Sequence, residues 1–217
     1  MWRKSNFYEA SARVPLMISA PPACRGQPGR GWWRGGEHFP EVVSSIDLIA
    51  TLLDICSIND GSTDPAEGGA ALLPPLDGDS LLPLLQRGPG SGALIGWKDE
   101  AVCEYLAHGV ERPTAMLRRG RYKLMFSLGD PPALFDVVSD PAELHDLLAT
   151  TYSQGQRQQQ QRDGGLSSDE AAVVAVALER RLFELWGNPE DIEAMVLASQ
   201  YARRCVTAAG TVRTARM

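Results

Sequence analysis

The chain has 217 residues and a formal net charge of −6, with 44% hydrophobic and 22% charged residues. These proportions are typical of a globular protein with one large domain or two small ones. An acidic chain lacks the basic face that nucleic-acid binding needs, so we expect no nucleic-acid partner. No apolar run reaches the roughly 20 residues of a membrane-spanning helix, so we expect no membrane partner.

The amino terminus and the cysteines indicate the compartment. Residues 1–4 lead into polar residues rather than an apolar segment, which predicts no secretory signal and a cytoplasmic location. The cysteines are dispersed without a CxxC pair, which indicates isolated thiols rather than a disulfide framework or a metal site. They are Cys24, Cys56, Cys103 and Cys205.

The first half of the chain predicts one strand and one helix. Residues 13–20 are apolar and precede Pro21-Pro22, which predicts a buried strand. Residues 42–58 have apolar side chains at helical spacing, which predicts a helix with that face buried. The predicted buried face consists of Val42, Ile46, Ile49, Leu52, Leu53 and Cys56.

The second half predicts a sheet followed by helices. Short strand signals at 101–107, 113–119, 121–128 and 133–138 are separated by brief turns, so we expect an antiparallel meander. A helix start is predicted at 140–143, from an Asp cap and a proline in the first turn. Residues 153–165 are rich in glutamine, and we expect them to be disordered.

Two more helices are predicted near the carboxyl end. Ser167 to Glu170 form a capping box ahead of a helix that ends at Trp186. Its apolar face would hold Val174, Leu178, Leu182 and Leu185. Asn188 and Pro189 then begin a helix whose predicted inner stripe is Ile192, Met195, Val196, Ser199 and Cys205.

Three strings stand out in this sequence. The first joins Lys4 to Phe7-Tyr8-Glu9 and Ser11-Ala12-Arg13-Val14-Pro15-Leu16, and the second is Leu76-Asp77-Gly78-Asp79-Ser80-Leu81-Leu82-Pro83-Leu84-Leu85. The third is Arg119-Gly120-Arg121-Tyr122-Lys123, followed by Leu134-Phe135-Asp136 and Asp140-Pro141-Ala142-Glu143. Together they resemble the sulfatase family, in a form similar to choline sulfatases. The resemblance covers roughly 1–20, 41–58, 76–85, 99–149 and 172–206.

The resemblance implies the carboxyl-terminal portion of a hydrolase of the alkaline phosphatase superfamily. The implied fold class is α/β (an α+β fragment): a remnant of the large sulfatase α/β domain followed by a small antiparallel sheet packed with helices. The expected domains are 1–58 as the end of the large catalytic domain, 59–98 as a linker, and 99–217 as the sheet and helices.

The implied reaction is the hydrolysis of choline O-sulfate to choline and sulfate. Lys4 occupies the position of a sulfatase active-site lysine, whose ammonium group would stabilise negative charge on the ester oxygens. The family implies a formylglycine nucleophile and a divalent cation, Ca²⁺ or Mg²⁺. No cysteine here lies in the Cys-x-Pro-x-Arg context and no Asp-His-Gly precedes Lys4, so we predict no metal ligands in this chain. Lys4 is the predicted catalytic residue, and the sequence does not identify the substrate-binding residues. The isolated chain would lack its amino-terminal catalytic half and its activity.

Other readings of the sequence stay open. An alternative is that the chain is part of another sulfatase or of a phosphonate monoester hydrolase, which share the lysine and the sheet. A non-catalytic scaffold or oligomerisation module, including a homo-oligomer, is a further alternative. The three histidines, His38, His108 and His145, are scattered and pair with no evident nucleophile.

Overall fold

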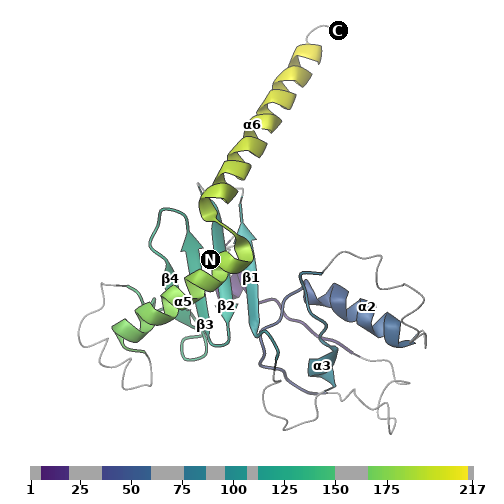
Figure 1. The fold of residues 1–217 in the computed structure, drawn as a ribbon, viewed down its shortest axis with the longest axis vertical. Helices are drawn as coiled ribbons and strands as arrows, with labels where there is room; N and C mark the ends of the chain where they lie inside the picture. The colour runs from purple at the N-terminus through teal and green to yellow at the C-terminus, as the bar shows by residue number, and fades with distance from the viewer. Residues whose placement is uncertain are drawn as a thin grey trace. The chain divides into compact units, whose positions relative to one another are not determined.

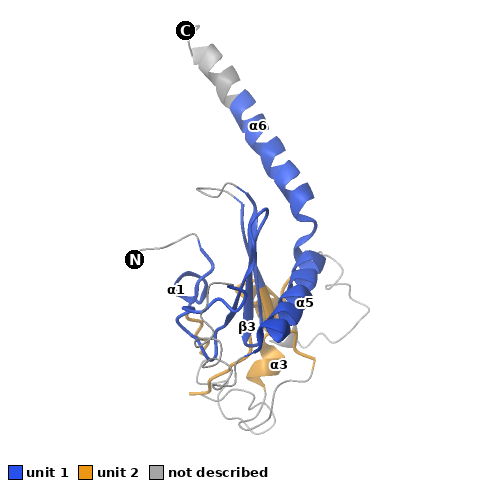
Figure 2. Cartoon of the chain, turned by 90° about the vertical axis from the view of Figure 1, so that its left-hand side faces the viewer, with its two compact units in different colours: residues 1–14, 102–217 blue, residues 15–101 orange. Residues whose placement is uncertain are grey.

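The structure is a computed structural model that describes residues 6–19, 36–59, 76–86, 96–106, 112–149 and 166–214, without the side chains of 57–59 and 206–214. Lys4, Cys24, His108 and the glutamine-rich stretch 153–165 lie outside the described residues. Two compact units divide the chain, residues 1–14 with 102–217, and residues 15–101 (Figure 2). The predicted domain limits stay a prediction. Within the described ranges, no helix is long and apolar enough to cross a bilayer.

An antiparallel sheet forms the centre of the first unit (Figure 1). Its strands are β1 (Glu100–Tyr105), β2 (Thr114–Arg119), β3 (Tyr122–Ser127) and β4 (Ala133–Asp136), in the order β1-β2-β3-β4. The pairs β2–β3 and β3–β4 are antiparallel. A two-residue turn, in which Gly120 has a φ of 53°, joins β2 to β3. The predicted meander is therefore confirmed, and with it the α+β arrangement.

Helix α5 (Ser168–Trp186) covers one face of the sheet. Alternate side chains of the strands, including Leu117, Leu124 and Leu134, are fully buried against it. The predicted capping box is confirmed, because the Ser167 hydroxyl accepts from the Glu170 amide and the Glu170 side chain accepts from the Ser167 amide. The helix buries Ala171, Ala175, Leu178 and Leu182, whereas the predicted inward residue Leu185 is 45% exposed.

The short helix α1 (Glu9–Ala12) lies on the opposite face of the sheet from α5 (Figure 2). The ring of Tyr8 meets the ring of Phe135 edge-on, with a centroid distance of 5.8 Å. The two faces of the sheet are thus covered by segments from the two ends of the sequence. This arrangement places residues 6–14 against β3 and β4.

Helix α6 (Pro189–Thr214) begins as predicted. The Asn188 side chain accepts hydrogen bonds from the amides of Glu190 and Asp191, at 2.9 and 3.1 Å. Ile192 is buried and Val196 is half-buried, but the prediction is wrong for Met195, which is 64% exposed, and for Ser199 and Cys205, which are also exposed. The helix leaves the sheet after its first turn, so its later side chains have little to pack against in the described part of the chain.

The second unit is organised by a buried acid at the start of α2 (Asp47–Asn59). The fully buried Asp47 carboxylate accepts from the amides of Ser44 and Asp79 and from Lys98 Nζ, at 2.7, 2.9 and 2.6 Å. Burial lowers the pKa of Lys98, but its hydrogen bonds to Asp47 and Asp79 outweigh that effect and raise it overall. The second sulfatase-like string, residues 76–85, is therefore bound to the buried carboxylate of Asp47.

Thr51, one turn after Asp47, makes a second contact between α2 and the segment at 76–86. Its hydroxyl accepts from the amide of Leu81, at 2.9 Å, just ahead of α3 (Leu82–Leu85). Because this polar face turns inward, the predicted apolar face is wrong: Ile46, Ile49 and Leu52 are 49%, 60% and 61% exposed. The helix also begins at Asp47 rather than at residue 42.

The predicted buried strand at 13–20 is wrong over its described part. Residues 13–19 have no strand pairing, and Val14, Leu16 and Met17 are 70%, 41% and 92% exposed. A strand needs a neighbouring strand to satisfy its backbone groups, and none of the described strands pairs with this segment. The segment is apolar, but within the described residues no sheet includes it.

Gly78→Ala should destabilise the second unit by about 1–3 kcal/mol, because a methyl group at this position would overlap the Ile46 carbonyl. Denaturant unfolding, followed by tryptophan fluorescence, measures the change. Asp77→Ala, an exposed change one residue earlier, is the control and should stay within about 0.5 kcal/mol. Equal effects of the two changes would show that the close approach at Gly78 is unimportant.

Candidate functional site

A buried charge cluster lies on the face of the sheet that carries α1. We define it as Glu9, Arg118, Lys123 and Glu143. The side chain of Lys123 is 1% exposed and that of Glu143 is 2% exposed. A buried charge is costly unless it is paired and hydrogen-bonded, so the contacts of Lys123 determine whether this face is stable.

The Lys123 ammonium group has three acceptors for its three N–H bonds. Its Nζ atom lies 2.6 Å from Glu143 Oε1, 2.5 Å from Glu9 Oε1 and 2.9 Å from the backbone oxygen of Phe7. Two of the three acceptors come from the amino-terminal segment. The cation is fully satisfied only when that segment is bound to the sheet.

Glu9 also balances a like-charge pair. Arg118 on β2 lies directly opposite Lys123 on β3, an arrangement that is unfavourable for two cations. Glu9 Oε1 contacts both, at 3.7 Å from Arg118 Nη1 and 2.5 Å from Lys123 Nζ. Two cations and two carboxylates therefore share the cluster, and the amino-terminal segment supplies one of the carboxylates.

Glu143 closes the cluster from the other side. Its Oε1 atom accepts from Lys123, and its Oε2 atom accepts from the backbone amide of Glu9 at 2.5 Å. Glu143 has a φ of 53°, which a right-handed helix does not allow, so the helix predicted to start at 140–143 does not form. The Asp140 carboxylate instead accepts from the amide of His145, at 2.8 Å. The strained backbone turns the Glu143 side chain inward.

The cluster fixes the chain directly after Lys4. Phe7 and Glu9 are held by Lys123 and Glu143, and the backbone then continues into α1, where the amides of Ser11 and Ala12 bond to the Tyr8 oxygen. Lys4 itself lies outside the described residues, so its catalytic role stays a prediction. What the structure describes is a firm attachment three residues beyond it.

A second ion pair stabilises the hairpin end of the sheet. Arg121 Nε donates to Asp136 Oδ1 at 3.0 Å, and Arg121 Nη2 contacts Asp136 Oδ2. Burial alone would raise the pKa of Asp136, but hydrogen bonds from Arg121 and Ser139, with the Arg121 charge, hold the pKa below its ordinary value. The aspartate of the third family string is thus a structural acceptor.

The other candidates from the sequence form no reactive group in the described residues. His38 is exposed, and His145 lies on the surface 3.3 Å from Asp140. Cys56, Cys103 and Cys205 are free and exposed. No group of three or more His, Cys, Asp or Glu side chains in the described ranges is placed to hold a metal. The described residues therefore do not fit the divalent cation or the formylglycine that the resemblance implies.

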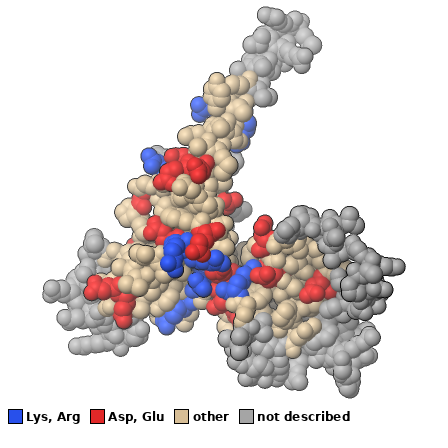
Figure 3. Space-filling model, in the orientation of Figure 1, with Lys and Arg blue, Asp and Glu red and all other residues tan. Residues whose placement is uncertain are grey.

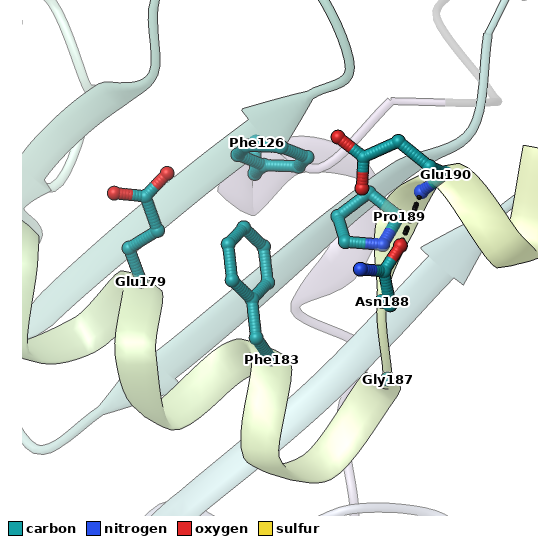
Figure 4. Close-up of a pocket in the computed structure, with 7 residues that line it drawn as sticks. All are labelled: Phe126, Glu179, Phe183, Gly187, Asn188, Pro189 and Glu190. Carbon is teal, nitrogen blue, oxygen red and sulfur yellow. Dashed lines mark hydrogen bonds between the residues drawn. The ribbon is translucent and has the colours of Figure 1, made fainter.

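A shallow pocket of about 450 Å³ lies on the α5 face (Figure 4). The rings of Phe126 and Phe183 meet edge-on inside it, 5.0 Å apart, with the Glu179 and Glu190 carboxylates at its sides. It is lined by Phe126, Glu179, Phe183, Gly187, Asn188, Pro189 and Glu190. The sheet separates this pocket from the charge cluster, so the two do not form one site.

The sequence predicts Lys123 on a strand and Glu143 at a helix start, and neither pattern indicates that the two side chains meet. The alternation of side chains along the strand could have predicted which face of the sheet Lys123 occupies. Lys123 is flanked by Tyr122 and Leu124, which both face α5, so its own side chain points to the opposite face. Nothing in the spacing indicated that residues 7–9 would cover that face.

No family model matches the chain. It is 30% identical over 147 residues to a choline-sulfatase of Rhizobium meliloti (strain 1021), covering 68% of this chain and 23% of that protein. It is 32% identical over 152 residues to arylsulfatase K of Gallus gallus, covering 66% and 24%. A solved phosphonate monoester hydrolase of Agrobacterium radiobacter aligns with a TM-score of 0.39 and 23% identity, over 64% of this chain and 24% of that one.

The antiparallel sheet packed with helices, together with these relatives, identifies the chain as a region of a sulfatase-like protein. The chain belongs to the sulfatase family and corresponds to its carboxyl-terminal portion, as the resemblance predicted. It spans about a quarter of the length of the curated relatives that it matches.

Lys123→Met should destabilise the first unit by about 3–5 kcal/mol, because it leaves two carboxylates without their buried cation. Urea unfolding measures the loss. Arg180→Met removes a cation whose side chain is 81% exposed, and it should cost less than about 1 kcal/mol. A Lys123→Met variant as stable as this control would contradict the role given to the cluster.

Asp136→Asn should remove a pH-dependent part of the stability. The folded pKa of Asp136 is depressed, so its contribution is present above the unfolded pKa and is lost as the pH falls below about 4. Wild type should therefore be more stable than the variant at neutral pH, and the two should converge in acid. Unfolding curves at several pH values test this, and a difference that stays constant into acid would contradict it.

Proposed function

We propose that this chain is the carboxyl-terminal part of a sulfuric ester hydrolase acting on a small-molecule sulfate ester, with choline O-sulfate as its substrate. One observation carries the proposal: residues of the first and third sulfatase-like strings, Glu9, Lys123 and Glu143, meet in one buried charge cluster. The similarity to a choline-sulfatase supports the choice of substrate.

In this proposal Lys4 contacts the sulfate group. Sulfate ester hydrolysis develops negative charge on the non-bridging and leaving oxygens, and a positioned ammonium group stabilises that charge. Lys4 precedes Phe7 by three residues, which span at most about 11 Å. Because Phe7 is bound to Lys123, the cluster limits where Lys4 can lie.

The amino-terminal catalytic half would supply the nucleophile and the metal. The described residues offer no metal-binding group, so the formylglycine and the divalent cation would belong to that half. We therefore propose that the isolated chain has no turnover. The free thiols of Cys56, Cys103 and Cys205 support a reducing, cytoplasmic location.

A second substrate class has a specific observation in its favour. Arylsulfatase K of Gallus gallus is 32% identical to this chain over 152 residues, close to the 30% over 147 residues of the choline-sulfatase. An aryl sulfate ester is therefore the alternative substrate. Both candidates share the same reacting group and the same proposed role for Lys4.

A chimera tests the proposal. This chain would replace the matching carboxyl-terminal part of the Rhizobium meliloti choline-sulfatase, and sulfate release would be measured from choline sulfate and from an aryl sulfate. We expect the folded chimera to hydrolyse choline sulfate. Preference for the aryl ester would select the alternative substrate, and a folded chimera inactive on both esters would contradict the proposed function.

Lys4→Ala in that chimera should lower kcat/KM by about 10²–10³-fold, the usual cost of losing one stabilising group at a developing anion. Arg3→Ala removes a neighbouring cation and serves as the control, with little expected effect. An active chimera that tolerates Lys4→Ala as well as Arg3→Ala would remove Lys4 from the mechanism. Sulfate release by the purified chain alone, lost on Lys4→Ala, would contradict its proposed dependence on a catalytic half.

A further inference from the structure

The pocket on the α5 face forms where the chain changes direction between two helices. Helix α5 ends before Gly187, whose φ of 102° favours glycine, and α6 begins at Pro189 along a different axis (Figure 1). Phe126, near the end of β3, and Phe183, in the last turn of α5, are therefore only half-buried. The opening beside them has a volume of about 450 Å³, within the roughly 300–1,000 Å³ of small-molecule sites.

Two aromatic rings give this pocket a preference for positive charge. The rings of Phe126 and Phe183 meet edge-on, with a centroid distance of 5.0 Å and an angle of 84° between their planes. In an edge-on pair, the ring that presents its edge keeps its own faces free for other contacts. The face of an aromatic ring carries partial negative charge and attracts cations.

Two carboxylates add full negative charge at the same place. Glu179 is half-buried and Glu190 is exposed, and they lie on either side of the rings (Figure 4). Neither forms an ion pair with another described residue, whereas Glu184 on the same helix as Glu179 pairs with Arg180 and Arg181. Acidic side chains are also visible at the base of α6 on the surface of the first unit (Figure 3).

The amino terminus of α6 opposes this negative charge only in part. A helix amino terminus is equivalent to about half of a positive charge. The Asn188 side chain already accepts hydrogen bonds from the amides of Glu190 and Asp191, at 2.9 and 3.1 Å, so these N–H groups are not available to an anion. Two carboxylates outweigh half of a positive charge, and the pocket is therefore net negative.

The cation that fits this pocket is organic rather than a metal ion. A hard divalent cation takes roughly six to eight oxygen ligands, and no group of His, Cys, Asp or Glu side chains in the described ranges is placed to hold a metal. A quaternary ammonium group is weakly hydrated and presents methyl groups, so it can contact aromatic rings and carboxylates together.

We propose that this pocket binds a small organic cation with a quaternary or methylated ammonium group, held by the Phe183 ring and the carboxylates of Glu179 and Glu190. The proposal does not rest on the proposed function, because it uses neither Lys4 nor the charge cluster. Binding to this pocket is also measurable on a chain that has no turnover.

An NMR titration of the full chain with tetramethylammonium chloride tests the site. We expect saturable chemical-shift changes at the residues that line the pocket, with a dissociation constant in the millimolar range because the pocket is shallow. Sodium chloride at the same ionic strength should give no saturable change there, and neither should tert-butyl alcohol, a neutral molecule of similar size. Shifts that do not saturate with tetramethylammonium, or equal binding of tert-butyl alcohol, would overturn the proposal.

Matched variants separate the pocket from general charge effects. Glu179→Gln and Glu190→Gln should each raise the dissociation constant about threefold or more, since each removes one of the two charges. Phe183→Leu keeps an apolar side chain but removes the ring, and it should weaken binding by a similar factor. Glu184→Gln removes a paired carboxylate outside the pocket lining and should leave the dissociation constant unchanged.

The backbone amide spectrum of each variant shows whether its fold is intact. The two glutamate variants change exposed or half-buried groups, so they decide the matter even where Phe183→Leu fails to fold. Equal effects of Glu179→Gln and Glu184→Gln would overturn the proposal. A folded Phe183→Leu variant that binds tetramethylammonium as tightly as wild type would overturn it as well.

Discussion

The structure of the first unit depends on one requirement: the buried ammonium group of Lys123 must be neutralised and hydrogen-bonded. A lysine on the inner strand of a sheet, directly opposite an arginine, would be unfavourable by itself. Glu143 provides one carboxylate from the turn after β4, and Glu9 provides the other from the amino-terminal segment. Because both are needed, two distant parts of the chain are bound to the same strand.

The second unit follows the same principle with the opposite charge. The buried carboxylate of Asp47 accepts from Lys98 and from the amide of Asp79, so a polar contact, rather than apolar burial, holds α2 to the segment at 76–86. In both units a residue from a sulfatase-like string takes part. The described residues of these strings therefore carry paired charges and close backbone approaches, which have a structural role in the fold.

The sequence predicted the elements better than the contacts. The four strands, the capping box at Ser167 and the cap at Asn188 follow from local chemistry, and the structure has them. The buried faces of α2 and α6 and the strand at 13–20 were wrong, because apolar spacing marks a surface that is able to pack without showing what covers it.

The candidate site was harder still to predict. Lys123 and Glu143 are 20 residues apart and Glu9 is more than 100 residues away, and only the fold brings them together. Glu143 also needs a positive φ that propensity argues against. Lys4 was identified by resemblance and lies outside the described residues. The resemblance therefore pointed to the segment around residues 7–9, but it did not indicate that Lys123 and Glu143 bind this segment.

Hydrogen exchange on a Lys123→Met variant tests this dependence most directly. The amides of Glu9, Ser11 and Ala12 are hydrogen-bonded in the attached segment, whereas those of Leu117 and Leu124 lie in paired strands. The account predicts that the variant loses protection first at residues 9–12 while β2 and β3 remain protected. Unchanged protection at residues 9–12 would contradict it, because the segment would then be held by something other than the buried ammonium group.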